Sequence, residues 1–128
     1  MRALVIDDSR AMRRIVGQTL RGLGFEPVEA EHGQHALDLL AGDGPVPALA
    51  CIDWNMPVMD GLTFVTRVRQ NPQWRDMTLM MVTTESEHGQ IVRALAAGAH
   101  EYLIKPFTTD AIRDKLELLG LVPVGESA

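Results

Sequence analysis

Five polar residues stand directly after four short apolar runs of the chain. They are Asp7 and Asp8, Asp53, Thr83 and Lys105. If the runs before Asp7 and Asp53 are neighbouring strands, three carboxylates approach closely, and each like-charged pair costs ~4 kcal/mol at 4 Å with an effective dielectric constant near 20. Either one carboxyl group is protonated, because repulsion raises its pKa, or a cation keeps the group ionised. An all-oxygen ligand set suits Mg²⁺, which retains several waters and accepts a phosphate oxygen as a further ligand.

Each of these residues also has an ordinary structural interpretation. Acidic residues after strands often cap helices or lie in solvated loops, a threonine can be a strand-end hydroxyl, and an isolated lysine is usually at the surface. The coincidence of all five at one edge of a sheet favours a site instead. Lys105 also precedes Pro106, and a cis peptide bond in such a turn would aim the lysine side chain.

The elements that must position these residues follow from the apolar pattern. Continuous apolar runs predict four buried strands, at Ala3–Ile6, Ala48–Ile52, Thr78–Val82 and Tyr102–Ile104. A fifth strand, Phe25–Ala30, contains Pro27, which lacks the N–H that a central strand needs, so it is predicted at the edge of the sheet.

Five helices are predicted to alternate with the strands. The first begins after Ser9, ends at Gly24 and carries a stripe made of Met12, Ile15, Val16, Thr19, Leu20 and Leu23. Its solvent side is predicted to hold Arg10, Arg13, Arg14 and Arg21. Asp60 and Thr108 are predicted to cap the third and fifth helices.

This alternation predicts an α/β fold, with a parallel sheet covered by helices on both faces. In such sheets the ligand crevice lies beyond the carboxyl ends of the strands, where the five polar residues stand. The length of 128 residues is typical of one domain. We expect a domain of residues 1–120 and a short tail of 121–128.

Composition excludes several classes of function. Twelve Lys and Arg residues against seventeen Asp and Glu give a net charge of -5, which argues against direct binding of nucleic acid or of an anionic membrane. Cys51 is the single cysteine, so no internal disulfide forms, and no Cys/His cluster has zinc-ligand spacing. The N-terminal apolar run stops at Asp7, too early for a signal peptide, and no run is long enough to span a membrane. We expect a cytoplasmic protein that does not insert into membranes.

Four segments together resemble a response-regulator receiver domain of two-component signalling. They are Ile6-Asp7-Asp8-Ser9, Asp53-Trp54-Asn55-Met56-Pro57-Val58-Met59-Asp60-Gly61, Thr83-Thr84-Glu85 and Tyr102-Leu103-Ile104-Lys105-Pro106-Phe107. Their order and spacing match the family from Ala3 to about Leu119. The resemblance implies a three-layer α/β/α fold with the flavodoxin-like strand order 2-1-3-4-5, which periodicity does not show.

The resemblance also implies a role for each site residue. Asp53 would accept a phosphoryl group from a phosphohistidine of a sensor histidine kinase or phosphotransfer protein. Asp8, Asp53 and the Asn55 backbone carbonyl would hold Mg²⁺, with Asp7 acting through a bound water. Lys105 would pair with Asp53 and then with its phosphoryl oxygens, accompanied by the Thr83 hydroxyl. Phosphoryl transfer needs in-line positioning and neutralised oxygen charge, which these groups can supply.

Signalling and hydrolysis involve further residues in this family. Thr83 would move toward the phosphoryl oxygen and let the Tyr102 ring turn inward, which reshapes the surface of the fourth helix, fifth strand and fifth helix. Asn55 and Glu85 would flank the water that hydrolyses the phosphoaspartate. Thr84 stands where the family usually has alanine or glycine, and its branched side chain would narrow access for the phosphodonor or slow hydrolysis.

Other polar and sulfur-containing groups keep two interpretations. The arginines of the first helix form its solvated side or meet an acidic kinase surface. Met56 and Met59 are adaptable contact residues or core filler. The histidines show no pairing at metal-ligand spacing and are predicted at the surface or its boundary: His32, His35, His88 and His100.

The resemblance predicts a stand-alone receiver that acts on no substrate other than its own phosphoryl group. Only nine residues follow Leu119, so we expect output through protein contact, by a monomer or weak homodimer. The chemotaxis-like target is a flagellar motor switch. A phosphorelay intermediate, a phosphate sink and an excised part of a longer regulator are alternatives.

Two further alternatives belong to other functional classes. A small aspartyl phosphohydrolase usually needs an acid two residues after its nucleophile, and Asn55 in that place cannot protonate a leaving group. A phosphorylation-independent interaction module would not need Asp8, Asp53, Thr83 and Lys105 together.

Overall fold

Five parallel strands form one sheet in the order β2-β1-β3-β4-β5 in the computed structural model, which describes residues 1–42, 44–84 and 87–122. The strands are β1 (Arg2–Ile6), β2 (Glu26–Ala30), β3 (Leu49–Ile52), β4 (Thr78–Thr83) and β5 (Glu101–Ile104). Every residue of β3 is buried, as expected of a strand covered on both faces. The predicted parallel sheet, the edge position of β2 and the strand order implied by the resemblance are confirmed.

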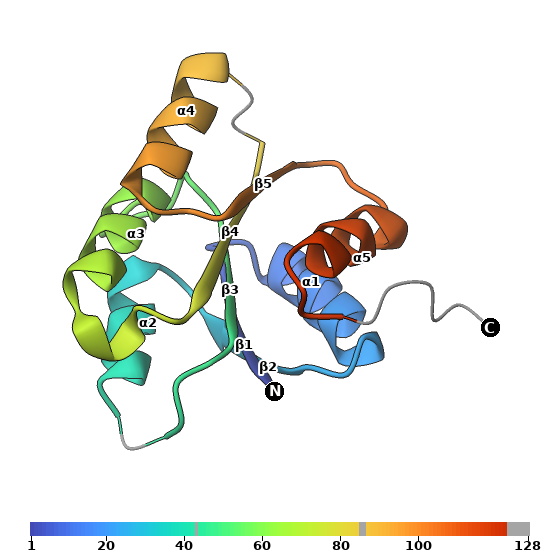
Figure 1. Cartoon of the computed structure of the whole chain (residues 1–128), viewed down its shortest axis with the longest axis horizontal. Helices are drawn as coiled ribbons and strands as arrows, with labels where there is room; N and C mark the ends of the chain where they lie inside the picture. The colour runs from blue at the N-terminus through green and yellow to red at the C-terminus, as the bar shows by residue number, and fades with distance from the viewer. Residues whose placement is uncertain (43, 85–86, 123–128) are drawn as a thin grey trace.

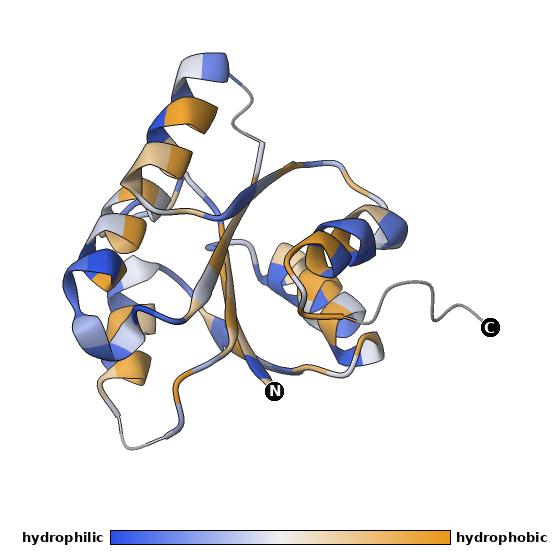
Figure 2. Cartoon of the chain, viewed as in Figure 1, coloured by the Kyte–Doolittle hydropathy of each residue, from blue (hydrophilic) through white to orange (hydrophobic). Residues whose placement is uncertain are grey.

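Helices cover both faces of this sheet (Figure 1): α2, α3 and α4 lie on one side, and α1 and α5 lie on the other. Their bounds are α1 (Arg10–Gly22), α2 (Gly33–Leu40), α3 (Gly61–Gln70), α4 (His88–Ala97) and α5 (Thr109–Leu118), and a short 3₁₀ helix, η1, spans Pro72–Trp74. The hydrophobic sides of the helices face the sheet (Figure 2). Two cores result, one around Phe64 and Met81 and the other around Leu20 and Ile112.

The three predicted helix caps are present. The side chains of Ser9, Asp60 and Thr108 accept hydrogen bonds from backbone N–H groups three residues later, at 3.2, 2.8 and 3.1 Å. Each such cap contributes about 1 kcal/mol. Because these helices start immediately after the loops of the sheet's carboxyl edge, the caps also fix where those loops end.

Helix α1 differs from its prediction at two residues. The prediction that Arg13 faces solvent is wrong: its residue exposure is 8%, whereas Ile15 of the predicted apolar stripe is 51% exposed. The Arg13 side chain lies against the end of β1 and the edge strand β2. The polar pattern of α1 gave the wrong prediction for Arg13, because the burial of this residue depends on hydrogen-bond partners in other elements.

Cys51 lies in β3 between β1 and β4, paired with Val5 and Met80 in the sheet register. It is 2% exposed, and burial raises the pKa of its thiol to about 12. The thiol is therefore protonated and unreactive in the folded protein.

The carboxyl-terminal part of the described chain packs on the α1–α5 side of the sheet. Leu121 and Val122 contact that core, and the Leu121 N–H donates to the Leu116 carbonyl at 2.9 Å. Among the residues that the structure describes, no helix combines the length and apolarity needed to cross a membrane.

Candidate functional site

The carboxyl edge of the sheet brings together side chains from four strands. Asp7 and Asp8 follow β1, Asp53 follows β3, Thr83 is the last residue of β4 and Lys105 follows β5. In the register of β1 and β3, Ile6 pairs with Ile52. Because these strands end at the same level, the residues after them reach one crevice.

Three carboxylates lie together at this edge of the sheet. Asp7, Asp8 and Asp53 each offer an oxygen, and these atoms all lie within 4.8 Å of one another. Asp7 and Asp53 are buried, whereas Asp8 is exposed, so the cluster opens to solvent on the Asp8 side. Such an all-oxygen donor set, with a route for water, fits a hard divalent cation such as Mg²⁺.

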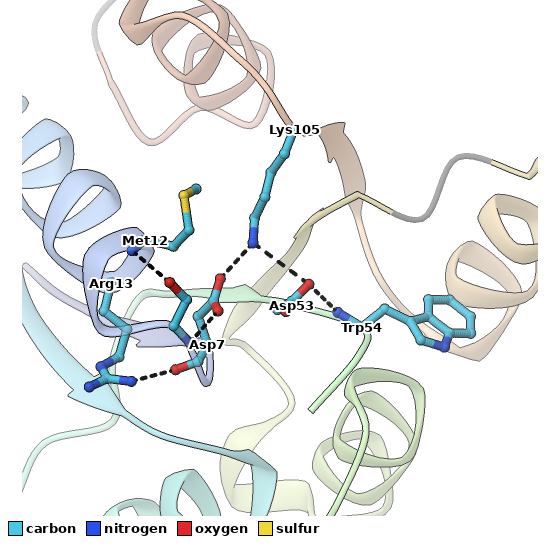
Figure 3. A network of polar contacts seen from close by, with 7 residues as sticks. Asp7, Met12, Arg13, Asp53, Trp54 and Lys105 are labelled. Atoms are coloured by element: carbon cyan, nitrogen blue, oxygen red, sulfur yellow. Dashed lines mark hydrogen bonds and ion pairs between the residues drawn. The ribbon is translucent and has the colours of Figure 1, made fainter. Parts of the chain in front are cut away.

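Lys105 reaches across the crevice from β5 (Figure 3). Its Nζ lies 2.6 Å from Asp7 Oδ2 and 3.8 Å from Asp53 Oδ1, and its side chain is 11% exposed. The peptide bond between Lys105 and Pro106 is cis, as expected. The ammonium group thus contacts both buried carboxylates and is closer to Asp7.

Asp53 is the carboxylate whose electrostatic environment is most unusual. Burial raises its pKa above the ordinary value, and the neighbouring Asp7 carboxylate raises it further. A hydrogen bond with Thr83, the charge of Lys105 and the Trp54 N–H, which donates at 2.9 Å, oppose that rise without cancelling it. The ionised form of Asp53 is therefore costly in the metal-free folded protein, and a bound cation would relieve that cost.

This raised pKa makes the stability of the metal-free protein depend on pH. Between the unfolded pKa, about 3.9, and the raised folded pKa, the folded state binds the Asp53 proton more tightly. The stabilisation from Asp53 is therefore complete below the unfolded pKa and is lost as pH rises through the folded pKa. We expect Asp53→Asn to be more stable than the wild type at pH 7 in EDTA.

Urea unfolding of both proteins in EDTA from pH 4 to 7 measures this effect. The stability difference in favour of Asp53→Asn should widen as pH rises and shrink when Mg²⁺ is added at pH 7. A difference that is constant over this range would contradict the proposed environment of Asp53.

Thr83 and Tyr102 lie on neighbouring strands behind the crevice. Thr83 is fully buried and is hydrogen-bonded to the Asp53 side chain. Tyr102 is 7% exposed, and its ring belongs to the core that α2, α3 and α4 cover. In the register of β4 and β5, Thr83 pairs with Ile104, two residues beyond Tyr102.

The mouth of the crevice is lined by exposed residues. Asn55 and Thr84 are both exposed. Thr84 lines an open cavity of about 460 Å³ together with Met12, Ile15, Lys105, Pro106 and Phe107. Glu85, the other residue expected to flank the hydrolytic water, lies outside the described residues. Met56 is half-buried, and Met59 is packed in the core.

Gly61, where α3 begins, has a role that the sequence motif alone did not reveal. A Cβ atom there would overlap the Asp53 carbonyl oxygen and lie 3.0 Å from Trp54 Cα. The Gly61 N–H also donates to the Trp54 carbonyl at 2.9 Å. The start of α3 therefore packs directly on the backbone of Asp53, and only a glycine at position 61 permits this close approach.

Val58 is strained within the same loop. It has φ 68°, a left-handed conformation that is costly for a β-branched residue, and it is 77% exposed. We expect Val58→Asn to raise the free energy of unfolding by about 1 kcal/mol, because asparagine tolerates this conformation. Chemical denaturation measures the change, and Val46→Asn, at another exposed loop valine without a positive φ, is the matched control. Equal effects of the two substitutions would contradict the strain argument.

The histidines do not join the acidic cluster among the described residues. His32 caps α2 by accepting the His35 N–H at 3.1 Å, and His35 Nδ1 accepts the Glu31 N–H at 3.1 Å. His100 Nδ1 lies 3.1 Å from both the Leu79 N–H and Arg69 Nη2, at the opposite end of the sheet. These three rings therefore serve local structure.

Comparison with known proteins agrees with this geometry. Residues 3–117 match the family described as the response regulator receiver domain. A chemotaxis protein CheY homolog of Campylobacter jejuni is 48% identical over 129 residues, covering 100% of this chain and 98% of that protein. The structure of chemotaxis protein CheY4 of Vibrio cholerae has a TM-score of 0.83 at 32% identity, covering 91% and 96% of the two chains. TrrA of Thermotoga maritima, solved in complex with Mg²⁺ and BeF, has a TM-score of 0.78 at 28% identity, covering 92% and 97%.

Proposed function

The chain belongs to the response regulator receiver family, and from that premise we propose that Asp53 is its phosphoryl acceptor. The observation that supports this most directly is the convergence of Asp7, Asp8 and Asp53 with Lys105 at one sheet edge. A receiver of this kind is a signalling switch and not a conventional enzyme. Its chemistry is gain and loss of its own phosphoryl group.

The residues around Asp53 suit it to nucleophilic attack. An Asp53 carboxylate oxygen forms a bond to phosphorus as the bond from phosphorus to the histidine nitrogen of the donor protein breaks. Lys105 Nζ, 3.8 Å from Asp53 Oδ1, neutralises charge on the phosphoryl oxygens. The Thr83 hydroxyl, already bonded to Asp53, provides a hydrogen bond to one of them. Positioning and charge neutralisation are the main requirements of this reaction.

Magnesium would be held by Asp8, Asp53 and the Asn55 backbone carbonyl, with Asp7 contributing through a water. The oxygens of the three carboxylates are close enough for one ion to contact them directly or through water. When bound, the ion neutralises phosphoryl oxygen charge. Asp7 also holds Lys105 by the 2.6 Å ion pair, so it keeps the ammonium group beside Asp53.

Phosphorylation would reach the surface through Thr83 and Tyr102. Tyr102 is 7% exposed and belongs to the core under α2, α3 and α4, which is where the inward rotamer would place its ring. The face of α4, β5 and α5 carries exposed Val92, Leu95 and Ile104, at 49%, 43% and 39% exposure. Apolar side chains in such a position suit a protein target, and the chemotaxis relatives favour a flagellar motor switch protein.

The lifetime of the phosphoryl group would be set at the mouth of the crevice. Asn55 and Glu85 would flank the water that attacks the phosphoaspartate. Thr84 would narrow that approach, and its exposed side chain lines a cavity together with Lys105. We expect the protein to act as a monomer or weak homodimer and to receive phosphate from a histidine kinase or phosphotransfer protein.

Incubation with acetyl phosphate, followed by intact mass measurement, tests the proposed chemistry. With Mg²⁺ the wild-type chain should gain the mass of one phosphoryl group, located on Asp53 by peptide mapping, and with EDTA it should gain none. Continuous release of phosphate from several phosphomonoesters would instead identify a phosphohydrolase.

A binding measurement tests the output. A purified flagellar motor switch protein should bind the beryllofluoride-treated chain more tightly than the untreated chain. Equal affinity in the two states would contradict switching through the α4-β5-α5 face.

A further inference from the structure

Arg13 is a buried cation of α1 that the phosphoryl-transfer mechanism does not use. Its Nη1 donates to the Asp7 backbone carbonyl at 2.7 Å, and its Nε donates to Glu29 Oε1 at 3.0 Å. Figure 3 shows the side chain running from α1 to the Asp7 carbonyl, on the opposite side of Asp7 from Lys105. The guanidinium therefore connects α1, the end of β1 and the edge strand β2.

The carbonyl that Arg13 holds belongs to the peptide unit joining Asp7 to Asp8. On the other side of Asp7, its N–H donates to the Ala30 carbonyl at 3.1 Å. The Asp7 side chain is fixed as well, by the Ser9 N–H at 2.9 Å and by Lys105. Asp8 is exposed, and the Asp7–Asp8 peptide that Arg13 holds sets the position of its backbone, from which its carboxylate projects.

The charge of Arg13 alone would act against cation binding. A guanidinium bonded to the Asp7 carbonyl repels a divalent ion bound at the carboxylates, although Glu29 pairs with it at 3.0 Å. Geometry and charge thus predict opposite effects of removing Arg13. Loss of charge alone would tighten Mg²⁺ binding, whereas loss of the hydrogen bond to Asp7 would weaken it.

We propose that Arg13 is a positioning residue that orients the Asp7–Asp8 peptide for Mg²⁺ binding. This inference rests on the proposed function, because it assumes that the acidic cluster binds Mg²⁺. Groups that orient metal ligands typically change metal affinity by about 10- to 100-fold when they are removed. The side chain acts through the backbone and does not itself touch the ion.

Calorimetric titration of the EDTA-treated protein with MgCl₂ tests the proposal at a temperature where each variant is folded. Arg13→Met, which keeps the length of the side chain, should raise the Kd for Mg²⁺ by about tenfold or more. Arg13→Lys should give an intermediate Kd, because it can restore one hydrogen bond to the Asp7 carbonyl. Arg14→Ala, which removes an exposed arginine from the next position of α1, should leave the Kd unchanged.

Each outcome decides the proposal. An unchanged Kd for Arg13→Met would overturn it, and so would a lower Kd, which charge alone explains. If Arg13→Met does not fold, Arg13→Lys decides the proposal instead, because it keeps the positive charge and gives up part of the hydrogen bonding; a Kd no higher than that of the wild type would overturn the proposal. Failure of the wild type to bind Mg²⁺ would reject the proposed function itself, before any variant is compared.

Discussion

Asp53→Asn is expected to lose phosphoryl acceptance while keeping the fold. The amide is not nucleophilic, so the rate of phosphorylation by acetyl phosphate with Mg²⁺ should fall by at least about 10³-fold. Asp7 should stay in place in this variant, because the Ser9 N–H and Lys105, at 2.6 Å, hold its carboxylate. Intact mass measured over time gives the rate directly.

Asp60→Asn is the matched control for this experiment. Asp60 lies in the same loop, but its side chain is exposed and caps α3, and asparagine is an equally good cap. Its phosphorylation rate should equal that of the wild type. If Asp53→Asn were phosphorylated at the wild-type rate, the acceptor would be another residue and the proposed function would be wrong.

Gly61→Ala is expected to damage both stability and chemistry. The added Cβ would overlap the Asp53 carbonyl oxygen and press on Trp54 Cα at 3.0 Å. Because these are backbone atoms of a loop held by hydrogen bonds, relief requires movement of the loop itself. We expect the free energy of unfolding to fall by about 3 kcal/mol, at the upper end of typical overpacking effects. Urea denaturation measures this loss.

Gly22→Ala makes the same chemical change as Gly61→Ala, but we expect it to raise the stability of the protein. Gly22 ends α1, and a Cβ there has no other atom within 4 Å, so alanine should stabilise the helix by about 0.5–1 kcal/mol. Where Gly61→Ala remains folded, it should also accept phosphate more slowly, since the Asp53 backbone must shift. A wild-type rate and stability for Gly61→Ala would show that α3 does not pack on Asp53 as described.

Much of the fold could be predicted because the signals were local. Apolar runs that end in acidic or hydroxyl residues mark buried parallel strands and their carboxyl ends, and Ser9, Asp60 and Thr108 mark helix starts. The convergence of Asp7, Asp8 and Asp53 follows once β1 and β3 are neighbours. That neighbour relation, however, came from the family resemblance and not from periodicity.

The contacts that could not be predicted are those between distant elements. The polarity of Arg13 placed it on the solvent side of α1, although its partners Asp7 and Glu29 bury it. Lys105 was expected beside Asp53, which follows β3. It also makes a shorter contact with Asp7, which follows β1, one strand further from β5. Side-chain reach across a sheet is a property of the assembled structure, which sequence spacing does not encode.

The buried thiol of Cys51 in β3 can be used to measure local opening of the folded protein. A reagent that alkylates thiolates can reach Cys51 only when the packing of α1 and α5 on the sheet opens, because the side chain is 2% exposed, lies in the core beneath these helices and has a pKa of about 12. The alkylation rate under native conditions therefore measures how often this core opens. A ligand that binds only the closed form should lower the alkylation rate by a factor of about one plus the ratio of the free ligand concentration to its Kd, and the measurement needs no engineered label.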